Sequence, residues 1–277
     1  MAQHPEIRIT KASGKEYLSH TVSTVSAAFD TDPVFHYFLN NSPSATEEHA
    51  LRTHLMTLIF SAASSSSGIF YEASISTQPA PTGPESLAPC TEGVEPEPRF
   101  HCAAIVMPPG KATDAPGLLG WLKIVRMGLF SLVYRIGLAR FYRVLFEYPA
   151  LFERPKHTAL APSETYYYVL ILGTDNSYRS RGLCSKLMIE LQKEGQKEMK
   201  PVWLEATTAT SRELYQKLGW EDVVTSETEE GGGLVLGRGK SDEEGNDKRG
   251  VEAKGVTIWP MVWWPDGYEK GRNKKSI

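Results

Sequence analysis

The stretch TYYYVLILGTDNSYRSRGLCSKLMIELQKEG, residues 165–195, decides the fold class of this chain. Its first part, residues 165–172, is rich in β-branched and aromatic side chains, which predicts a buried strand. A polar loop follows at 175–181, and residues 183–198 then carry apolar side chains at helical spacing. The stretch therefore predicts a strand, a loop and a helix in direct succession.

The start of this helix is a candidate anion site. The first turn of a helix has unpaired backbone N–H groups and the positive end of the helix dipole. Gly182 lets a ligand approach the backbone closely, and Arg179 and Arg181 add positive charge. Together these features favour a bound pyrophosphate. The alternative is an ordinary strand–loop–helix unit with a glycine in a tight turn.

Composition narrows the class of protein. The chain has 277 residues, of which 41% are hydrophobic and 10% aromatic, so collagen, coiled coil and complete disorder are excluded. The net charge of −3 gives no basic field of the kind that binds nucleic acid. The three cysteines lack CxxC spacing, which argues against a disulfide framework and a zinc site and is typical of a reducing compartment. We expect no metal.

The sequence also carries no obvious membrane signal. The N-terminus lacks a basic segment followed by an apolar one, so we expect no signal peptide. The most apolar stretch, residues 118–146, is interrupted by lysine and arginine, whereas a spanning helix needs roughly 20 nearly uncharged residues. We therefore expect a cytoplasmic protein without a membrane partner. The sequence leaves the oligomeric state open.

Along the chain, strands and helices alternate around two segments of unusual composition. Residues 73–98 are rich in proline and small polar residues, and 226–254 are rich in glycine and charge, so both are predicted to be disordered insertions in one domain of residues 1–277. Strands are predicted at 7–9, 69–72, 100–107, 165–172, 202–206, 221–225 and 256–263. Helices are predicted at 15–29, 47–63, 118–146 (one or two, with a break near Gly137), 183–198 and 211–218.

Two motifs in fixed order resemble a known superfamily. The segment RSRGLC, from Arg179 to Cys184, resembles the Q/R-x-x-G-x-G/A signature of the GNAT acyltransferases. About thirty residues later, LYQKLGW, from Leu214 to Trp220, is similar to the helix ending aromatic-x-x-x-G-[FW] of the same superfamily. Weaker similarity of AAFDTDPVFHYF and CAAIVMPPG points to the puromycin N-acetyltransferase-like branch.

This resemblance implies a fold and a cofactor. The fold would be one α/β (α+β) domain with a mixed, mostly antiparallel sheet flanked by helices and splayed between the strands at 166–172 and 202–206. The cofactor would be acetyl-CoA, the acyl donor. Its binding residues would lie in the loop and helix start and along the preceding strand, whose backbone N–H groups would also serve the oxyanion: Leu170, Ile171, Leu172, Arg179, Ser180, Arg181, Gly182, Leu183, Cys184 and Ser185.

The resemblance also suggests the catalytic residues. Tyr215 would be the general acid near the CoA sulfur, with packing against the sheet as the alternative. Glu205 lies within a buried strand, where a carboxylate needs a partner. It is either a general base, acting directly or through water, or a structural acceptor for the hydroxyls of Thr207 or Thr208. Tyr168 stands where several members of the superfamily carry a glutamate base.

Asp32, Phe35 and His36 follow the first predicted helix, where the acceptor pocket lies in the superfamily. An acidic patch formed by Asp30 and Asp32 would attract a cationic amine. The alternative is that these two residues, ahead of Pro33, form a turn that ends the helix.

Three functions compete. The first is transfer of an acetyl group to a small-molecule amine. The second is acetylation of protein lysines or N-termini, which the bulky helical segment before residue 148 and the long insertions disfavour. The third is a non-catalytic acyl-CoA-binding protein, a hypothesis favoured by Cys184 in place of the usual Gly or Ala and opposed by Tyr215 and Gly182.

Overall fold

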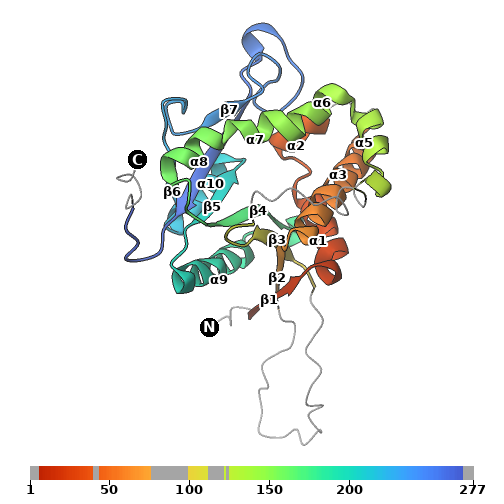
Figure 1. Ribbon diagram of the computed structural model, residues 1–277. Helices are drawn as coiled ribbons and strands as arrows, with labels where there is room; N and C mark the ends of the chain where they lie inside the picture. Colours follow the sequence, from red (N-terminus) through yellow and green to blue (C-terminus); the bar gives the residue numbers. More distant parts are fainter. Residues whose placement is uncertain (1–5, 40–43, 76–98, 112–121, 123–124, 271–277) are drawn as a thin grey trace, which may run out of the picture.

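The computed structural model describes residues 6–39, 44–75, 99–111, 122 and 125–270 (Figure 1). Its strands are β1 (Ile7–Ser13), β2 (Ile69–Ile75), β3 (Cys102–Met107), β4 (Tyr167–Thr174), β5 (Val202–Ala206), β6 (Glu221–Asp222), β7 (Leu234–Leu236) and β8 (Val256–Trp263). The α-helices are α1 (Lys15–Ala28), α2 (Pro33–Leu39), α3 (Ala45–Ser65), α5 (Leu129–Ile136), α6 (Leu138–Tyr142), α7 (Tyr148–Leu151), α8 (Glu153–Ala159), α9 (Leu183–Glu198) and α10 (Ala209–Lys217). Short turns of other helix types are η1 (Arg143–Glu147), η2 (Asn176–Tyr178) and η3 (Gly250–Glu252).

The strands form one mixed sheet in the order β1-β2-β3-β4-β5-β8-β6, with β7 paired to β8. Neighbouring strands are antiparallel, apart from β4 and β5, which run parallel. Helices pack on both sides of the sheet (Figure 1). The predicted fold class, a single α/β domain with a mostly antiparallel sheet, is confirmed.

The parallel pair β4 and β5 is joined over a short distance only. Its register covers Tyr167 with Val202 and Tyr168 with Trp203, and the two strands then separate. Beyond Tyr168, β4 stays paired with β3 on its other edge. The splay predicted between these strands is therefore present, and it leaves the β5-facing edge of β4 without a strand partner from Val169 to Thr174.

A β-bulge lies within the splayed part of β4. Ile105 pairs with Ile171 and Val106 with Val169, so Leu170 has no residue opposite it on β3. Leu170 and Ile171, although adjacent, both pack against the same hydrophobic cluster, because the extra residue breaks the alternation of side chains. The bulge turns the backbone of β4 at the point where the strands separate.

The two faces of the sheet are covered by different helices. On one face, alternate strand residues such as Ile105 and Trp203 pack with α1, α2, α3 and α5. On the other face, Val106 and Leu204 pack with α9 and with Tyr215 of α10. The period of two along each strand thus divides the core into two layers.

A helical segment between β3 and β4 adds a cover on the first face. The predicted helix at 118–146 lies partly outside the described residues, and its described part is divided into α5, α6 and η1, with the predicted break at Gly137, which has a φ of 82°. The chain then continues through α7 and α8, which the sequence analysis did not predict. Arg135 pairs with Glu47 and Arg140 with Asp247, so these charges serve contacts within the fold.

The prediction that residues 226–254 are disordered is wrong. Leu234–Leu236 pairs with β8, and both Leu234 and Leu236 are buried. Backbone hydrogen bonds from Gly239 to Ala253 and from Gly255 to Ser241 close the turns that follow. The three apolar residues of the LVL motif form strand β7. The glycine-rich composition of the whole segment gave no indication of them. Residues 73–75 of the first predicted insertion belong to β2, which the prediction did not include, and most of its remainder lies outside the described residues.

Gly245 tests the packing of this second segment on α2. Its φ is +86°, and an added Cβ would lie 2.1 Å from the carbonyl oxygen of Pro33. Gly239 is a matched control, since its φ is +76° but nothing lies within 4 Å of the added Cβ. Gly239→Ala is expected to lower the free energy of unfolding by about 1–2 kcal/mol through backbone strain alone. Gly245→Ala should lose at least about 2 kcal/mol more in urea denaturation. Equal losses would show that the segment is not packed as described.

Candidate functional site

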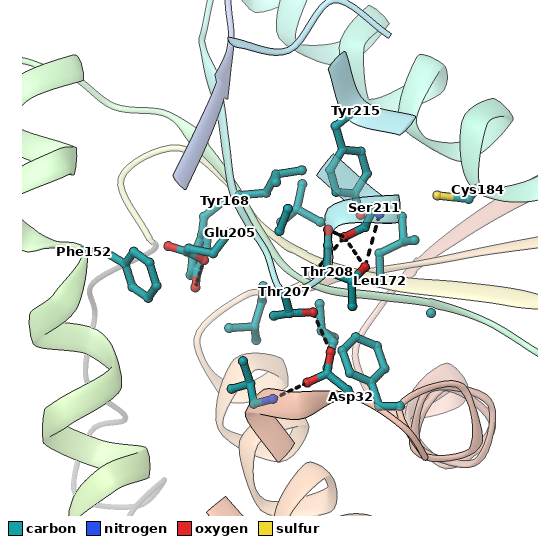
Figure 2. A pocket seen from close by; sticks show the side chains of 18 of the residues that line it. Asp32, Phe152, Tyr168, Leu172, Cys184, Glu205, Thr207, Thr208, Ser211 and Tyr215 are labelled. Carbon is teal, nitrogen blue, oxygen red and sulfur yellow. Dashed lines mark hydrogen bonds between the residues drawn. The ribbon is translucent and has the colours of Figure 1, made fainter. Parts of the chain in front are cut away.

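One large cleft passes through the sheet where β4 and β5 separate. Its volume is about 1490 Å³, above the roughly 300–1,000 Å³ of an ordinary small-ligand pocket. It is lined from one face by Tyr168 and Glu205 and from the other by Cys184 and Tyr215. Figure 2 shows these side chains around the same space, with Asp32 at its lower border. The cleft has room for a long ligand together with a second one.

The start of α9 forms one end of the cleft. Gly182 is the N-cap, with a left-handed φ of 79° that favours glycine. No side chain caps this helix, so the backbone N–H groups of its first turn face the cleft region without a capping partner. All seven residues predicted to cradle an anion line the cleft, namely Arg179, Ser180, Arg181, Gly182, Leu183, Cys184 and Ser185.

The loop that leads into α9 is held in a defined position. The Asp175 backbone N–H donates to the carbonyl of His101, at 2.9 Å, and the ring of Tyr178 stacks on the His101 ring with centroids 3.7 Å apart. Burial lowers the pKa of His101, which favours the neutral, stacking form of the ring. A loop fixed in this way presents its backbone to a ligand without further ordering.

The two predicted arginines have different surroundings. Arg179 Nη2 donates to the carbonyl oxygen of Ala28, at 2.7 Å, and so ties the loop to the end of α1. Arg181 Nη2 donates to the carbonyl of Ser177, at 3.2 Å, and its guanidinium lies 5.1 Å from the centroid of the Tyr178 ring. Arg179 thus also positions the loop, a role that the sequence analysis did not foresee.

The middle of the cleft is the open edge of β4. Leu170, Ile171 and Leu172 line it, as expected for residues that would contact a cofactor. On this edge their strand is not paired with β5. An unpaired strand edge offers its N–H and C=O groups to an extended ligand. The bulge at Leu170 reorients one peptide within the same stretch.

Tyr215 lies on α10 with its ring buried at the side of the cleft. The ring centroid is 5.9 Å from that of Trp220, and the two planes are tilted by 48°. Burial raises the pKa of Tyr215 well above 10 and keeps the phenol protonated throughout the neutral range. Burial likewise raises the pKa of the Cys184 thiol, so this cysteine is not a thiolate.

Glu205 is the centre of a polar cluster on the opposite face. Tyr168 Oη donates to Glu205 Oε2, at 2.9 Å, and Trp203 Nε1 donates to Glu205 Oε1, at 2.6 Å. Lys156 Nζ lies 3.4 Å from Oε1. The alternative in which Thr207 or Thr208 donates to Glu205 is therefore wrong. Thr207 instead bonds Asp32, and Thr208 caps α10 through Ser211.

Asp32 is buried in the lining of the cleft and links two elements. Its Oδ1 accepts from the backbone N–H groups of Val34 and Phe35, so it caps α2, and its Oδ2 accepts from Thr207 Oγ1 at 2.5 Å. Burial raises the pKa of Asp32 from 3.8 to about 6, against the opposing effect of these hydrogen bonds. The predicted turn at Asp32 and Pro33 is thus a helix start, which Asp followed by Pro indicates in hindsight.

The other predicted acceptor residues divide between the cleft and its outside. Phe35 lines the cleft, whereas His36 does not. His36 Nε2 lies 3.1 Å from the carbonyl oxygen of Asp30 and 3.3 Å from Glu48. Asp30 pairs with the buried Arg52, so the acidic patch of Asp30 and Asp32 expected from the sequence does not form in the cleft.

The sequence analysis missed the residues of α7, of α8 and of the turn between them that complete the lining, among them Tyr148, Phe152 and Lys156. Their signal is weak, because α7 has four residues and α8 seven, too few for a periodic pattern. Pro149 and Glu153 at early helix positions are the cues that were available.

The described residues contain no group of three or more His, Cys, Asp or Glu placed to hold a metal ion. Over the same part of the chain, none of the helices combines the length and the apolar composition needed to cross a membrane. Cys102 and Cys184 are free thiols.

The raised pKa of Asp32 predicts a specific pH dependence of stability. Between pH 3.8 and about 6 the folded state binds the proton more tightly than the unfolded chain, so stability falls as the pH rises through this window. The difference between the two pKa values corresponds to roughly 3 kcal/mol. In urea denaturation, the free energy of unfolding of the native protein minus that of Asp32→Asn should therefore decrease from pH 4 to pH 6.5 by up to that amount. A difference that is constant or rises with pH would contradict the assignment.

No protein-family model matches this sequence, and no curated protein matches it. Solved structures do match its fold. A protein described as histone acetyltransferase HPA2 and related acetyltransferase, from Corynebacterium glutamicum, is 16% identical with a TM-score of 0.51, covering 93% of this chain and 96% of that one. A putative arylalkylamine N-acetyltransferase 7 from the mosquito Aedes aegypti is 10% identical with a TM-score of 0.52, covering 93% and 87%.

The C-terminal condensation domain of Ebony, solved with beta-alanyl-dopamine, is also similar, with 10% identity and a TM-score of 0.52 over 94% of this chain and 99% of that domain. At these identities the likeness concerns the fold. The chain has the GNAT fold that its two sequence motifs led us to expect.

Proposed function

We propose that this protein transfers an acetyl group from acetyl-CoA to the amine of a small molecule. The observation that carries the proposal is the single cleft that joins the start of α9 and the open edge of β4 to the buried carboxylates Asp32 and Glu205. One end has the donors suited to phosphate, and the other has the negative charge suited to an ammonium ion. The puromycin N-acetyltransferase-like branch stays a prediction.

The residues present fit acetyl-CoA as the donor. Backbone N–H groups from Arg179 to Ser185 would hold the pyrophosphate. Gly182, whose positive φ favours glycine, has no side chain to block that approach. The unpaired edge of β4 would bind the pantetheine amides as an added strand. An N–H between Leu170 and Leu172 would stabilise the oxyanion, in a peptide turned by the bulge. Bound acetyl-CoA would supply an activated acyl group as a thioester.

Tyr215 would donate a hydrogen bond to the departing sulfur. Its raised pKa makes complete proton transfer to a thiolate more uphill than for a free phenol, so the hydrogen bond itself is the greater contribution. The same raised pKa means that Tyr215 adds no alkaline limb to the pH profile below pH 10. The role of Glu205 as a general base stays a prediction. Both of its oxygens already accept hydrogen bonds, which makes them less available to a substrate proton.

The cover over the acceptor end favours a small molecule. Tyr148 of α7 and Phe152 of the adjoining turn line the cleft, and Figure 2 shows Phe152 on the side of Glu205. A protein substrate would need an open groove there. Acetylation of proteins remains the second hypothesis, and binding of acyl-CoA without catalysis remains the third.

A coenzyme A release assay over a panel of small amines tests the proposal. The panel should include arylalkylamines, polyamines and an N-terminal lysine peptide, so that the first two hypotheses separate. Release with a small amine is expected, and Gly182→Glu should abolish both release and acetyl-CoA binding by calorimetry. Gly182→Ala is the matched control, because it carries the same backbone strain without a charge opposite the pyrophosphate. Equal acetyl-CoA affinity in Gly182→Glu and the native protein would exclude the site. Tight binding without release would favour the third hypothesis.

Tyr215→Phe tests the role of the phenol. The substitution keeps the ring and its packing against Trp220, so the melting temperature should change little. The turnover number should fall by roughly 10²–10⁴, the usual contribution of a positioned acid. The Michaelis constant for acetyl-CoA should stay near its original value, because the lost contact acts mainly in the transition state. Normal turnover on the best acceptor would show that Tyr215 only packs.

A further inference from the structure

A lysine of the protein itself lies in a complete cation site inside the cleft. Lys156 Nζ is 3.4 Å from Glu205 Oε1, 4.7 Å from the centroid of the Tyr168 ring and 5.6 Å from that of the Trp203 ring. A carboxylate with two electron-rich rings is the combination that binds an alkylammonium ion. The Lys156 ammonium therefore marks the position and the chemistry of such a site.

The site is rigid and mostly dry. The Glu205 side chain is 3% exposed, and Tyr168 and Trp203, which donate to its two oxygens, fix its orientation. Trp203 is fully buried. A carboxylate this far from water needs a positive partner, which Lys156 supplies.

Lys156, by contrast, reaches the site through a long aliphatic side chain that can change rotamer. It comes from α8, a helix of seven residues at the border of the cleft, and its side chain is 27% exposed. Both Lys156 and Glu205 line the cleft, and Figure 2 shows Glu205 on the side of Phe152. Lys156 can therefore swing into solvent along the cleft, while Glu205, Tyr168 and Trp203 stay in place.

We propose that Glu205, Tyr168 and Trp203 form the subsite that binds the ammonium group of the acceptor, and that Lys156 occupies it until the acceptor displaces it. The identity of the ligand as the acceptor rests on the proposed function. The binding of an ammonium ion at this subsite does not require catalysis. The ligand class is a primary ammonium ion on an alkyl or arylalkyl chain. Lys156 is an internal competitor of this ligand.

Competition follows from charge. Two ammonium ions next to one buried carboxylate repel each other, so the ligand and Lys156 exclude one another. The apparent affinity of the ligand is reduced by the fraction of molecules in which Lys156 holds the site. Removing the Lys156 ammonium should therefore tighten ligand binding, the opposite of what loss of an ordinary contact does.

The experiment measures binding of phenethylammonium to the full chain by calorimetry, without acetyl-CoA. Lys156→Met keeps the aliphatic arm and removes the charge, and its dissociation constant should fall about tenfold. Lys156→Arg keeps the competitor and should stay near the native value. Lys193→Met is the matched control, since Lys193 is exposed and pairs with Glu190 on α9, away from this subsite. The dissociation constant of the neutral analogue 2-phenylethanol should be the same in all three variants as in the native protein.

A second variant keeps the test valid if Lys156→Met unfolds because Glu205 is left without its partner. Lys156→Met combined with Glu205→Gln removes both charges, and it should melt near the native temperature but bind phenethylammonium at least tenfold more weakly than the native protein. Unchanged or weaker binding in folded Lys156→Met overturns the proposal, and so does native-like binding in the double variant.

This result is separable from the proposed function. Tighter binding in Lys156→Met without coenzyme A release from any amine would support the subsite and contradict the transferase. Coenzyme A release together with unaltered amine binding in Lys156→Met would support the transferase and contradict the subsite.

Discussion

The early end of pairing between β4 and β5 is the constraint on which the rest of the site depends. Two paired positions, at Tyr167 and Tyr168, hold the strands together at one end of the gap, and the cleft opens beyond them. A sheet that stayed closed would leave no passage between its two faces. The N–H and C=O groups on both edges of β4 would then be paired with neighbouring strands. The bulge at Leu170 adds to the effect, because it reorients one peptide within the stretch where the pairs with β5 are missing.

Buried polar groups hold the open edges of this gap in place. Asp32 joins the start of α2 to Thr207 at the end of β5, and Glu205 joins β5 to Tyr168 of β4 on the same face. These carboxylates are costly to bury, and each has hydrogen-bond donors that offset the cost. The burial that raises the pKa of Asp32 shows that the offset there is incomplete. A structure that keeps such a group inside a cleft retains negative charge where a cation can reach it.

The sequence predicted the sheet and the strand–loop–helix unit at the start of α9 well, because both depend on local patterns. The strand at 165–172, the loop and Gly182 carry their signals in adjacent residues, and the GNAT-like motifs lie within about fifty residues of one another. The polar contacts of Asp32 and Glu205 at the other end of the cleft were predicted poorly, because they join distant segments. Lys156 and Glu205, or Thr207 and Asp32, meet only through the fold, and α7 and α8 are too short for a periodic pattern. The LVL strand inside the glycine-rich segment was missed because average composition hid three residues that pair with β8.

The division of the cleft by the sheet also separates the two proton-handling tasks of the proposed transfer. An ammonium acceptor has to lose its proton before its nitrogen can attack, and the departing sulfur has to gain stabilisation. Asp32 and Glu205 lie on the side from which the acceptor would enter, whereas Tyr215 lies on the side of α9 and α10. Glu205, with three donors around it, is suited to hold a positive charge in place rather than to remove a proton. Asp32 also accepts from three donors, the backbone N–H groups of Val34 and Phe35 and the Thr207 hydroxyl, but burial raises its pKa to about 6, so it holds a proton more readily than an exposed aspartate does. In the proposed transfer, the sheet would thus place both carboxylates on the side of the acceptor and the phenol on the side of the departing sulfur, a separation that the residue types alone do not show.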